Sequence, residues 1–90
     1  MDPAKADSVL NALFDRIDDL SGPALRDSAL AVFNSPGVSD KDKALAAYLA
    51  ANGHAKLDDP ARGCDWARRA VSLDPTQRSY SALVQSICQP

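Results

Sequence analysis

The chain has 90 residues, of which 46% are hydrophobic and 24% charged, and its formal net charge is −2. A chain of this length suits one domain with a thin core, because about 60 to 65% of its unfolded surface should become buried on folding. No apolar run reaches the roughly 18 residues of a membrane-spanning helix, and no signal peptide is visible, so we expect no membrane insertion by this segment.

Charge is uneven along the chain, and every acidic residue is aspartate. Residues 1–39 carry 6 Asp against 3 Lys or Arg, a net −3, and residues 40–90 carry 6 Asp against 7 Lys or Arg, a net +1. Aspartate is a poor helix former but a strong N-cap, so many of these residues are expected to mark helix starts. The balance offers no basic face for nucleic acid.

Apolar residues recur at helical spacing throughout, and nowhere do they alternate as a strand would require. The sequence therefore predicts an all-α fold with about five helices. The first is expected over residues 3–20, opened by an Asp-Pro pair and carrying Phe14 on its apolar side. The second is expected over 23–33, before the turn-forming segment 34–37.

Three further helices are expected in the second half of the chain. Ser39 has the position of an N-cap for a helix that begins near Asp40, and Asn52-Gly53 either ends this helix or lies within it. The fourth helix is expected over 60–73, between an Asp-Pro pair that opens it and an Asp-Pro pair that closes it. The fifth, over 76–88, has one wet face and would close the fold.

These helices group into two units that have similar starts. Residues 3–37 and 39–75 would each form an antiparallel helical hairpin, and 76–88 would form a capping helix. The segment that begins at Leu20 resembles the one that begins at Leu57, an offset of 37 residues. This spacing is near the roughly 34-residue period of two-helix repeats.

Residues 44–75 resemble the tetratricopeptide repeat superfamily, and partly the related Sel-one-like repeats. The resemblance is carried by small residues where paired helices approach closely, by an aromatic residue in the second helix and by the closing Asp-Pro: Ala51, Asn52-Gly53, Asp59, Gly63, Trp66, Ala70, Leu73 and Asp74-Pro75. Ala47 and Ala67 depart from the pattern, which favours large side chains there.

The resemblance implies a partner-binding groove on the first helix of each pair. Carried onto this chain, the groove residues would be Leu45, Tyr48, Asn52 and Lys56, although Asn52 and Lys56 also fit an ordinary solvated helix face. The expected function is a non-catalytic module for protein interaction or assembly, with a protein or peptide as partner. The alternative is a terminal docking domain of a larger membrane-anchored or repeat protein.

The two cysteines are placed symmetrically about a predicted turn. The midpoint of Cys64 and Cys88 is residue 76, between the fourth and fifth helices, and residues equally far from the turn of an antiparallel hairpin lie opposite one another. We therefore predict a disulfide, which implies an oxidising compartment such as a periplasm or the cell exterior. Two buried free thiols are the alternative, and they would imply the cytoplasm.

Residue patterns typical of enzymes and cofactor sites are missing. His54, the only histidine, has no Cys or Glu at a zinc-site spacing, and we expect it to be solvated. Asp40 and Asp42 lack the Gly and Glu of a calcium loop, and no phosphate loop or nucleophile motif is present. We expect no enzyme activity, no metal and no cofactor.

A second resemblance involves Ser28. The segment Asp27-Ser28-Ala29-Leu30 looks like the phosphopantetheine attachment motif of acyl and peptidyl carrier proteins, which are also small, acidic and helical. The resemblance would make Ser28 the modified residue. However, Ser28 falls inside a predicted helix, and short motif matches arise by chance.

Overall fold

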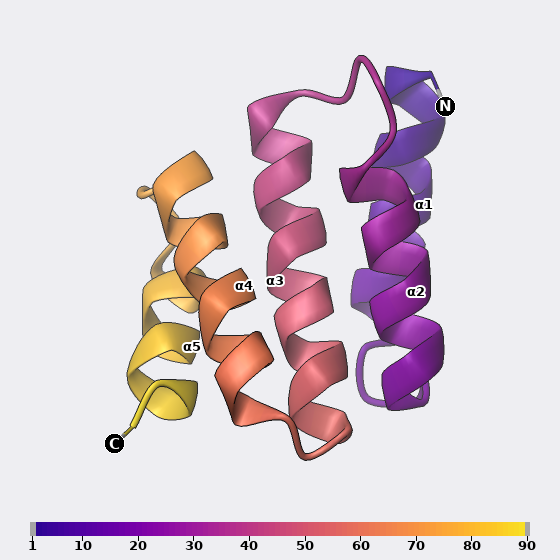
Figure 1. Ribbon diagram of the computed structural model, residues 1–90. Coiled ribbons are helices and arrows are strands. Elements are labelled where there is room, and N and C mark those ends of the chain that lie inside the picture. Colours follow the sequence, from indigo (N-terminus) through magenta and orange to yellow (C-terminus); the bar gives the residue numbers. More distant parts are fainter. Residues whose placement is uncertain (1, 90) are drawn as a thin grey trace.

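A computed structural model describes residues 2–89, which form five helices and no strand (Figure 1). The helices are α1 (Pro3–Asp15), α2 (Gly22–Phe33), α3 (Asp40–Lys56), α4 (Pro60–Leu73) and α5 (Arg78–Ile87). The all-α fold with five helices is confirmed. Asn52-Gly53 lies within α3, which resolves the alternative that the sequence left open.

Side-chain caps fix the starts of the first four helices. Asp2, Ser21, Ser39 and Asp59 each accept a hydrogen bond from the backbone N–H three residues further on, over 2.9 to 3.3 Å. Each bond satisfies a donor that the first helical turn leaves free. By contrast, α5 has no side-chain cap, and it begins at Arg78, two residues later than predicted.

The first helix is shorter than predicted, because α1 ends at Asp15, residues 16–19 form turns and Leu20 lies in a bend. Asp15, Asp18 and Asp19 lie at or just beyond this end, where the helix dipole disfavours negative charge. The carbonyls of this connection find a distant partner: Lys56 Nζ donates to the oxygens of Ile17 and Leu20, the latter over 2.6 Å.

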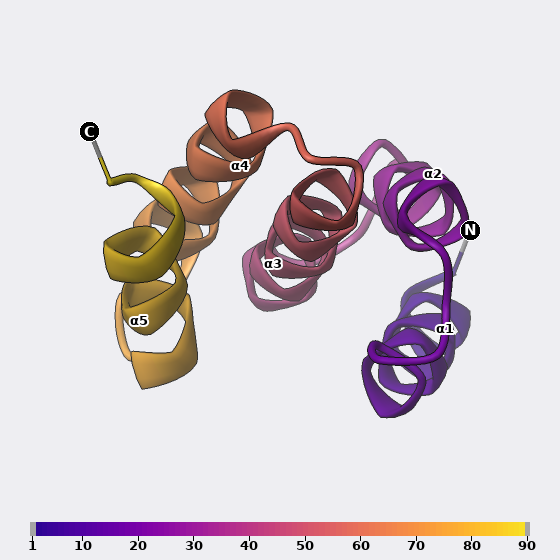
Figure 2. The ribbon, with the colours of Figure 1, turned by 90° about the horizontal axis from the view of Figure 1, so that it is seen from below.

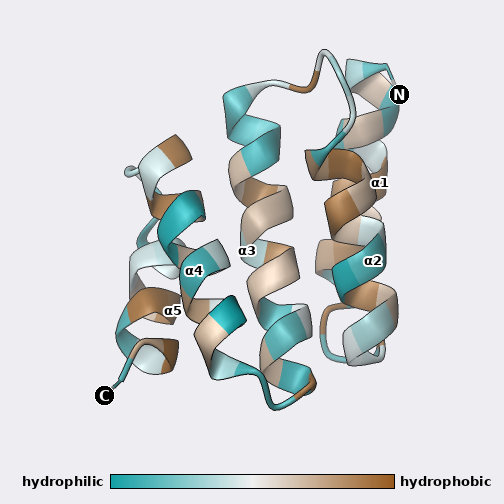
Figure 3. Ribbon diagram, viewed as in Figure 1, coloured by the Kyte–Doolittle hydropathy of each residue, from teal (hydrophilic) through white to brown (hydrophobic). Residues whose placement is uncertain are grey.

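The middle helix, α3, is buried on most of its circumference. It lies between α2 and α4. Its middle part is rich in alanine and is coloured pale brown in Figure 3, between hydrophilic ends. Small residues allow neighbouring helices to come close. A Cβ atom on Gly53 would lie 2.7 Å from the backbone nitrogen of Arg26 in α2, and one on Gly63 in α4 would lie 3.2 Å from the Ala51 oxygen.

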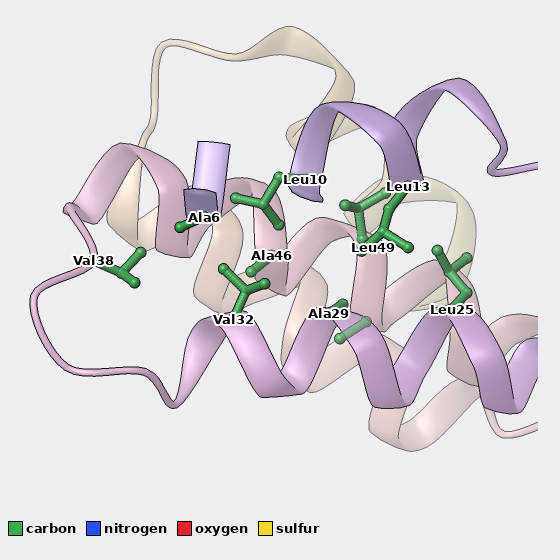
Figure 4. Close-up of a cluster of buried hydrophobic side chains, with 10 residues drawn as sticks. Ala6, Leu10, Leu13, Leu25, Ala29, Val32, Val38, Ala46 and Leu49 are labelled. Carbon is green, nitrogen blue, oxygen red and sulfur yellow. The ribbon is translucent and has the colours of Figure 1, made fainter. Parts of the chain in front are cut away.

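Two hydrophobic clusters hold these helices together. The larger joins α1, α2 and α3, and Figure 4 shows its leucine, valine and alanine side chains converging between the three helices. The smaller joins α3, α4 and α5 through Ala44, Ala47, Ala70 and Tyr80. The core is therefore continuous along α3 and thinnest at α5, where Tyr80 is the only buried residue.

Viewed along the helices, the chain follows an arc (Figure 2). The helices α1 and α5 project on one side, with α3 recessed between them, while α2 and α4 lie on the opposite side. The packing thus places the first, third and fifth helices around one concave face. Because α3 contributes to both core clusters, it holds the two walls of that face in position.

A disulfide joins Cys64 in α4 to Cys88, which follows directly after α5, with 5.0 Å between their Cα atoms. The predicted pairing is thus present, and it lies across the turn between the two helices. A bridge with a sequence separation of 24 residues restricts the unfolded chain and is expected to stabilise the fold by about 3.5 kcal/mol.

Candidate functional site: a groove between α1, α3 and α5

A cavity of about 310 Å³ opens on the concave face, and we call it the α1–α3–α5 groove. Its residues come from the two walls and the recessed helix between them. They are Asp7, Asn11 and Phe14 of α1, Lys41, Asp42 and Leu45 of α3, and Asp74, Gln77, Ser79 and Tyr80 at α5 and the segment before it.

Three aromatic rings connect the helices of the groove. The Tyr48 ring lies between Phe14 of α1, at 6.4 Å between ring centroids, and Tyr80 of α5, at 5.0 Å. Phe14 is 48% exposed, whereas Tyr80 is only 6% exposed. The groove therefore has a rigid aromatic base and an apolar ring open to solvent at its α1 wall.

Negative charge predominates in the groove, which has three carboxylates and one ammonium group, that of Lys41. The Asp74 carboxylate accepts hydrogen bonds from the Thr76 hydroxyl, over 2.6 Å, and from its backbone N–H, over 3.2 Å. The hydroxyl is the main cause that lowers the pKa of Asp74, and nearby Lys41 acts in the same direction. Asp74 is therefore ionised at neutral pH.

Tyr80 is the most buried of these groups. Burial, together with the negative charges of Asp74 and Asp42, raises the pKa of its hydroxyl to about 12. The phenol is therefore a neutral hydrogen-bond donor at physiological pH. None of the hydrogen bonds among residues 2–89 uses this hydroxyl, and burial and charge, not hydrogen bonding, account for its shifted pKa.

The predicted groove residues divide into two pairs. Leu45 lines the cavity, whereas Tyr48 is not a lining residue but contacts two of them, Phe14 and Tyr80, through its ring. Asn52 donates from Nδ2 to the Tyr48 carbonyl in its own helix, over 2.9 Å. The Lys56 ammonium contacts the carbonyls after α1. Leu45 therefore lies in the groove and Tyr48 next to its lining residues, whereas Asn52 and Lys56 make contacts within the fold.

Sequence reasoning missed the groove's walls. Phe14 was expected on the apolar side of the first helix, whereas it is 48% exposed at the α1 wall. Helical spacing gave no indication that Asp42 and Tyr80 would line the same cavity. The signal that would have found them is the arrangement of alternate helices around one face. Applying it requires knowing how the helices pack, which depends on contacts between segments that are distant in sequence.

His54 is a further correction, because it is 6% exposed and not solvated. Its Nδ1 atom is buried without a hydrogen-bond partner among residues 2–89, and it lies 3.9 Å from Oδ2 of Asp59. Burial lowers the pKa of His54; the Asp59 carboxylate opposes this, and Arg26 and Arg62 reinforce it. The neutral imidazole is therefore the favoured form.

Among residues 2–89 no group of three or more Cys, His or Asp side chains is placed to hold a metal ion, and none of the described helices is both long and apolar enough to cross a bilayer. Ser28 lies in the middle of α2 and is half-buried. This position gives no support to its modification by phosphopantetheine.

Comparison with known proteins found no matching family model, no matching curated protein and no matching solved structure. The resemblance to tetratricopeptide repeats therefore stays a prediction.

Proposed function

We propose that the chain is a non-catalytic protein-interaction module that binds a segment of its partner in the α1–α3–α5 groove. The observation that carries this proposal is the exposed Phe14 ring at the edge of a preformed concave face, where it lies beside Tyr48, which in turn lies beside Tyr80. Exposed aromatic rings that are held rigidly are typical anchors of protein interfaces.

The dimensions of the groove favour a short anchor of a partner protein. Small-molecule sites typically enclose about 300 to 1,000 Å³, so a cavity of about 310 Å³ is at the lower limit of that range. Its walls come from three helices that the core holds in place, so little ordering is needed on binding. A few side chains from a peptide or a helix would fill the space.

The test uses two exposed apolar residues that differ in their position. Phe14→Ala removes the ring at the groove, whereas Leu57→Ala truncates a side chain of similar exposure, 37%, that lies outside the groove. Both variants would be checked for native helicity by circular dichroism. The immobilised proteins would then capture partners from native extract for quantitative mass spectrometry.

We expect a partner that the wild-type chain and Leu57→Ala recover equally, and that Phe14→Ala recovers at least fivefold less. Equal recovery of every protein by all three chains would contradict the groove as the binding site.

A second candidate function is docking to a neighbouring domain through the outer side of the α4–α5 pair. A cavity of about 460 Å³ on this side is lined by half-buried Val71 and Val84 beside Arg68. Apolar residues at the last helix of an array are where a further helix would pack. Val84→Ser should then weaken association with that domain while leaving capture through the groove unchanged, as measured by the same assay.

The disulfide supports an oxidising compartment for the protein, because such bonds persist outside the cytoplasm. Thiol counting on the denatured, unreduced protein from its natural source tests this location. We expect no reactive thiol, and two reactive thiols would return the protein to the cytoplasm.

A further inference from the structure

The chemistry of the groove indicates which kind of segment it would bind, an inference that rests on the proposed function. Three carboxylates from three parts of the chain, Asp7, Asp42 and Asp74, line one cavity with a single ammonium group, that of Lys41. Their mutual repulsion is relieved only in part by Lys41, so a cation that enters the cavity gains favourable Coulomb energy.

Tyr80 adds a second polar feature to the same cavity. The residue is only 6% exposed, its hydroxyl has no hydrogen-bond partner among residues 2–89, and this oxygen is not one of the fully buried polar atoms. The hydroxyl is therefore accessible from the cavity, and it can donate to a carbonyl of a bound peptide.

Phe14 and Leu45 favour a cationic side chain over a free small cation as the ligand. They line the same cavity, so a ligand that fills it must place apolar atoms beside its charge. Lysine and arginine do so, since a methylene stem separates their charge from the backbone. A free metal ion or ammonium would leave these apolar walls in contact with water.

We propose that the α1–α3–α5 groove binds a peptide segment of a partner protein through a lysine or arginine side chain with an apolar neighbour. The cationic group lies among Asp42, Asp74 and the Tyr80 hydroxyl, and the apolar neighbour packs on Phe14. Charge-assisted hydrogen bonds to the two carboxylates give the segment its specificity.

The test selects ligands without assuming a sequence. A displayed library of random 12-residue peptides is panned on the disulfide-bonded chain, and the enriched peptides are synthesised and their affinities measured. Two double variants are compared: Asp42→Asn with Asp74→Asn inside the groove, and Asp18→Asn with Asp65→Asn outside it. Asparagine at position 74 keeps the oxygen that accepts from Thr76, so the start of α5 is preserved.

We expect the enriched peptides to share a lysine or arginine beside an apolar residue. Their affinity should fall about tenfold with the groove variant, and also when norleucine replaces the basic residue. It should change less than twofold with the outer variant. Raising the salt concentration should weaken the wild-type complex more than the complex with the groove variant.

Different results would overturn different parts of the proposal. Peptides that need Phe14 but show no excess of basic residues would remove the cationic anchor and leave the proposed function intact. Failure to enrich any peptide that is sensitive to Phe14→Ala would contradict the proposed function itself. Equal affinity for lysine amide alone would replace the peptide site with a small-cation site.

Discussion

Asp58 has a backbone conformation that is unusual for a residue with a side chain. Its φ is +58°, and it follows α3 in a Schellman motif, in which the N–H of Asp58 bonds to the Ala55 oxygen and that of Asp59 to the His54 oxygen. Glycine is the usual residue at this position, because a Cβ atom disfavours left-handed backbone. The contribution of residue 58 to stability therefore depends on its backbone conformation and not on side-chain packing.

Asp58→Gly is accordingly expected to raise the free energy of unfolding by about 0.5 kcal/mol, which is the relief of strain less the added entropy of the unfolded chain. Asp58→Ala keeps the strain and replaces aspartate, which tolerates left-handed backbone better than most residues do, so it should lower stability. Urea denaturation of the three proteins measures both changes. A glycine variant less stable than the wild type would show that the Asp58 side chain outweighs its strained backbone.

His54 makes stability depend on pH through a single group. An unfolded histidine titrates near pH 6.5, whereas burial lowers the pKa of His54 in the folded chain. Between these values the unfolded chain binds a proton that the folded chain does not. The stabilising contribution of the neutral imidazole is therefore fully present above about pH 6.5. This contribution is lost as the pH falls towards the lowered pKa, by at most about 1.4 kcal/mol per pH unit.

Urea midpoints at pH 7.5, 6.5 and 5.5 test this prediction, because His54 is the only histidine and aspartates titrate mainly near pH 4. His54→Gln should abolish the decrease between pH 6.5 and 5.5, whatever its effect on absolute stability. Retention of the full decrease in His54→Gln would assign it to other groups. Asp59, Arg26 and Arg62 are the charged groups that act on the imidazole, and the lowered pKa of Asp59 keeps its carboxylate ionised over this range.

At the scale of the element, the close contacts of α3 depend on two glycines in different surroundings. A Cβ on Gly53 would meet the backbone of Arg26, at 2.7 Å from nitrogen and 2.9 Å from Cα, whereas one on Gly63 would meet the tip of Ile87 first, at 2.5 Å. A side-chain tip can rotate away at little cost, but two packed helix backbones must separate.

Gly53→Ala is therefore expected to lower the free energy of unfolding by about 1 to 3 kcal/mol, since overpacking exceeds the gain in helix propensity. Gly63→Ala should cost clearly less, because the same gain in propensity offsets a smaller rearrangement. Thermal melts of both variants would compare them. Equal losses would mean that the α3–α4 contact is as rigid as the α2–α3 contact.

The boundaries of the helices illustrate what a sequence can predict. The starts of α1, α3 and α4 matched because a capping side chain and the N–H that it satisfies are three residues apart. The end of α1 did not match: the helix stops at Asp15, and the carbonyls of Ile17 and Leu20 beyond it bond to Lys56, which is 36 residues away from Leu20. Signals within a few residues, or within one hairpin as for the cysteine pair, can be identified in a single sequence, whereas the contact of Lys56 has no local signal.

At the scale of the whole molecule, the groove also combines a part that the sequence predicts with a part that it does not predict. The face of α3 that carries Leu45 and Tyr48 follows from helical spacing together with the resemblance to known repeats, so it was predictable. The walls that face it come from α1 and α5, and their residues meet only because the helices follow an arc. A single sequence contains no direct signal of that curvature.

The same curvature makes the groove depend on the disulfide. Only Tyr80 of α5 is buried, and α5 has no side-chain cap at its start, so this helix contributes few interactions of its own. The Cys64–Cys88 bond attaches its far end to α4. Without the bond, α5 should open locally more often than the rest of the fold, because local stability follows the density of buried contacts.

Cys64→Ala with Cys88→Ala is expected to lower the free energy of unfolding by about 3.5 kcal/mol and to reduce hydrogen-exchange protection in α5 before α2 and α3. Wild-type protein treated with dithiothreitol should behave similarly, and the double variant should not respond to the reductant. Since Tyr80 forms part of the groove, affinity for selected peptides should fall with the fraction of molecules in which α5 is docked. Unchanged protection of α5 amides in the reduced protein would show that packing around Tyr80 holds this wall without the covalent bond.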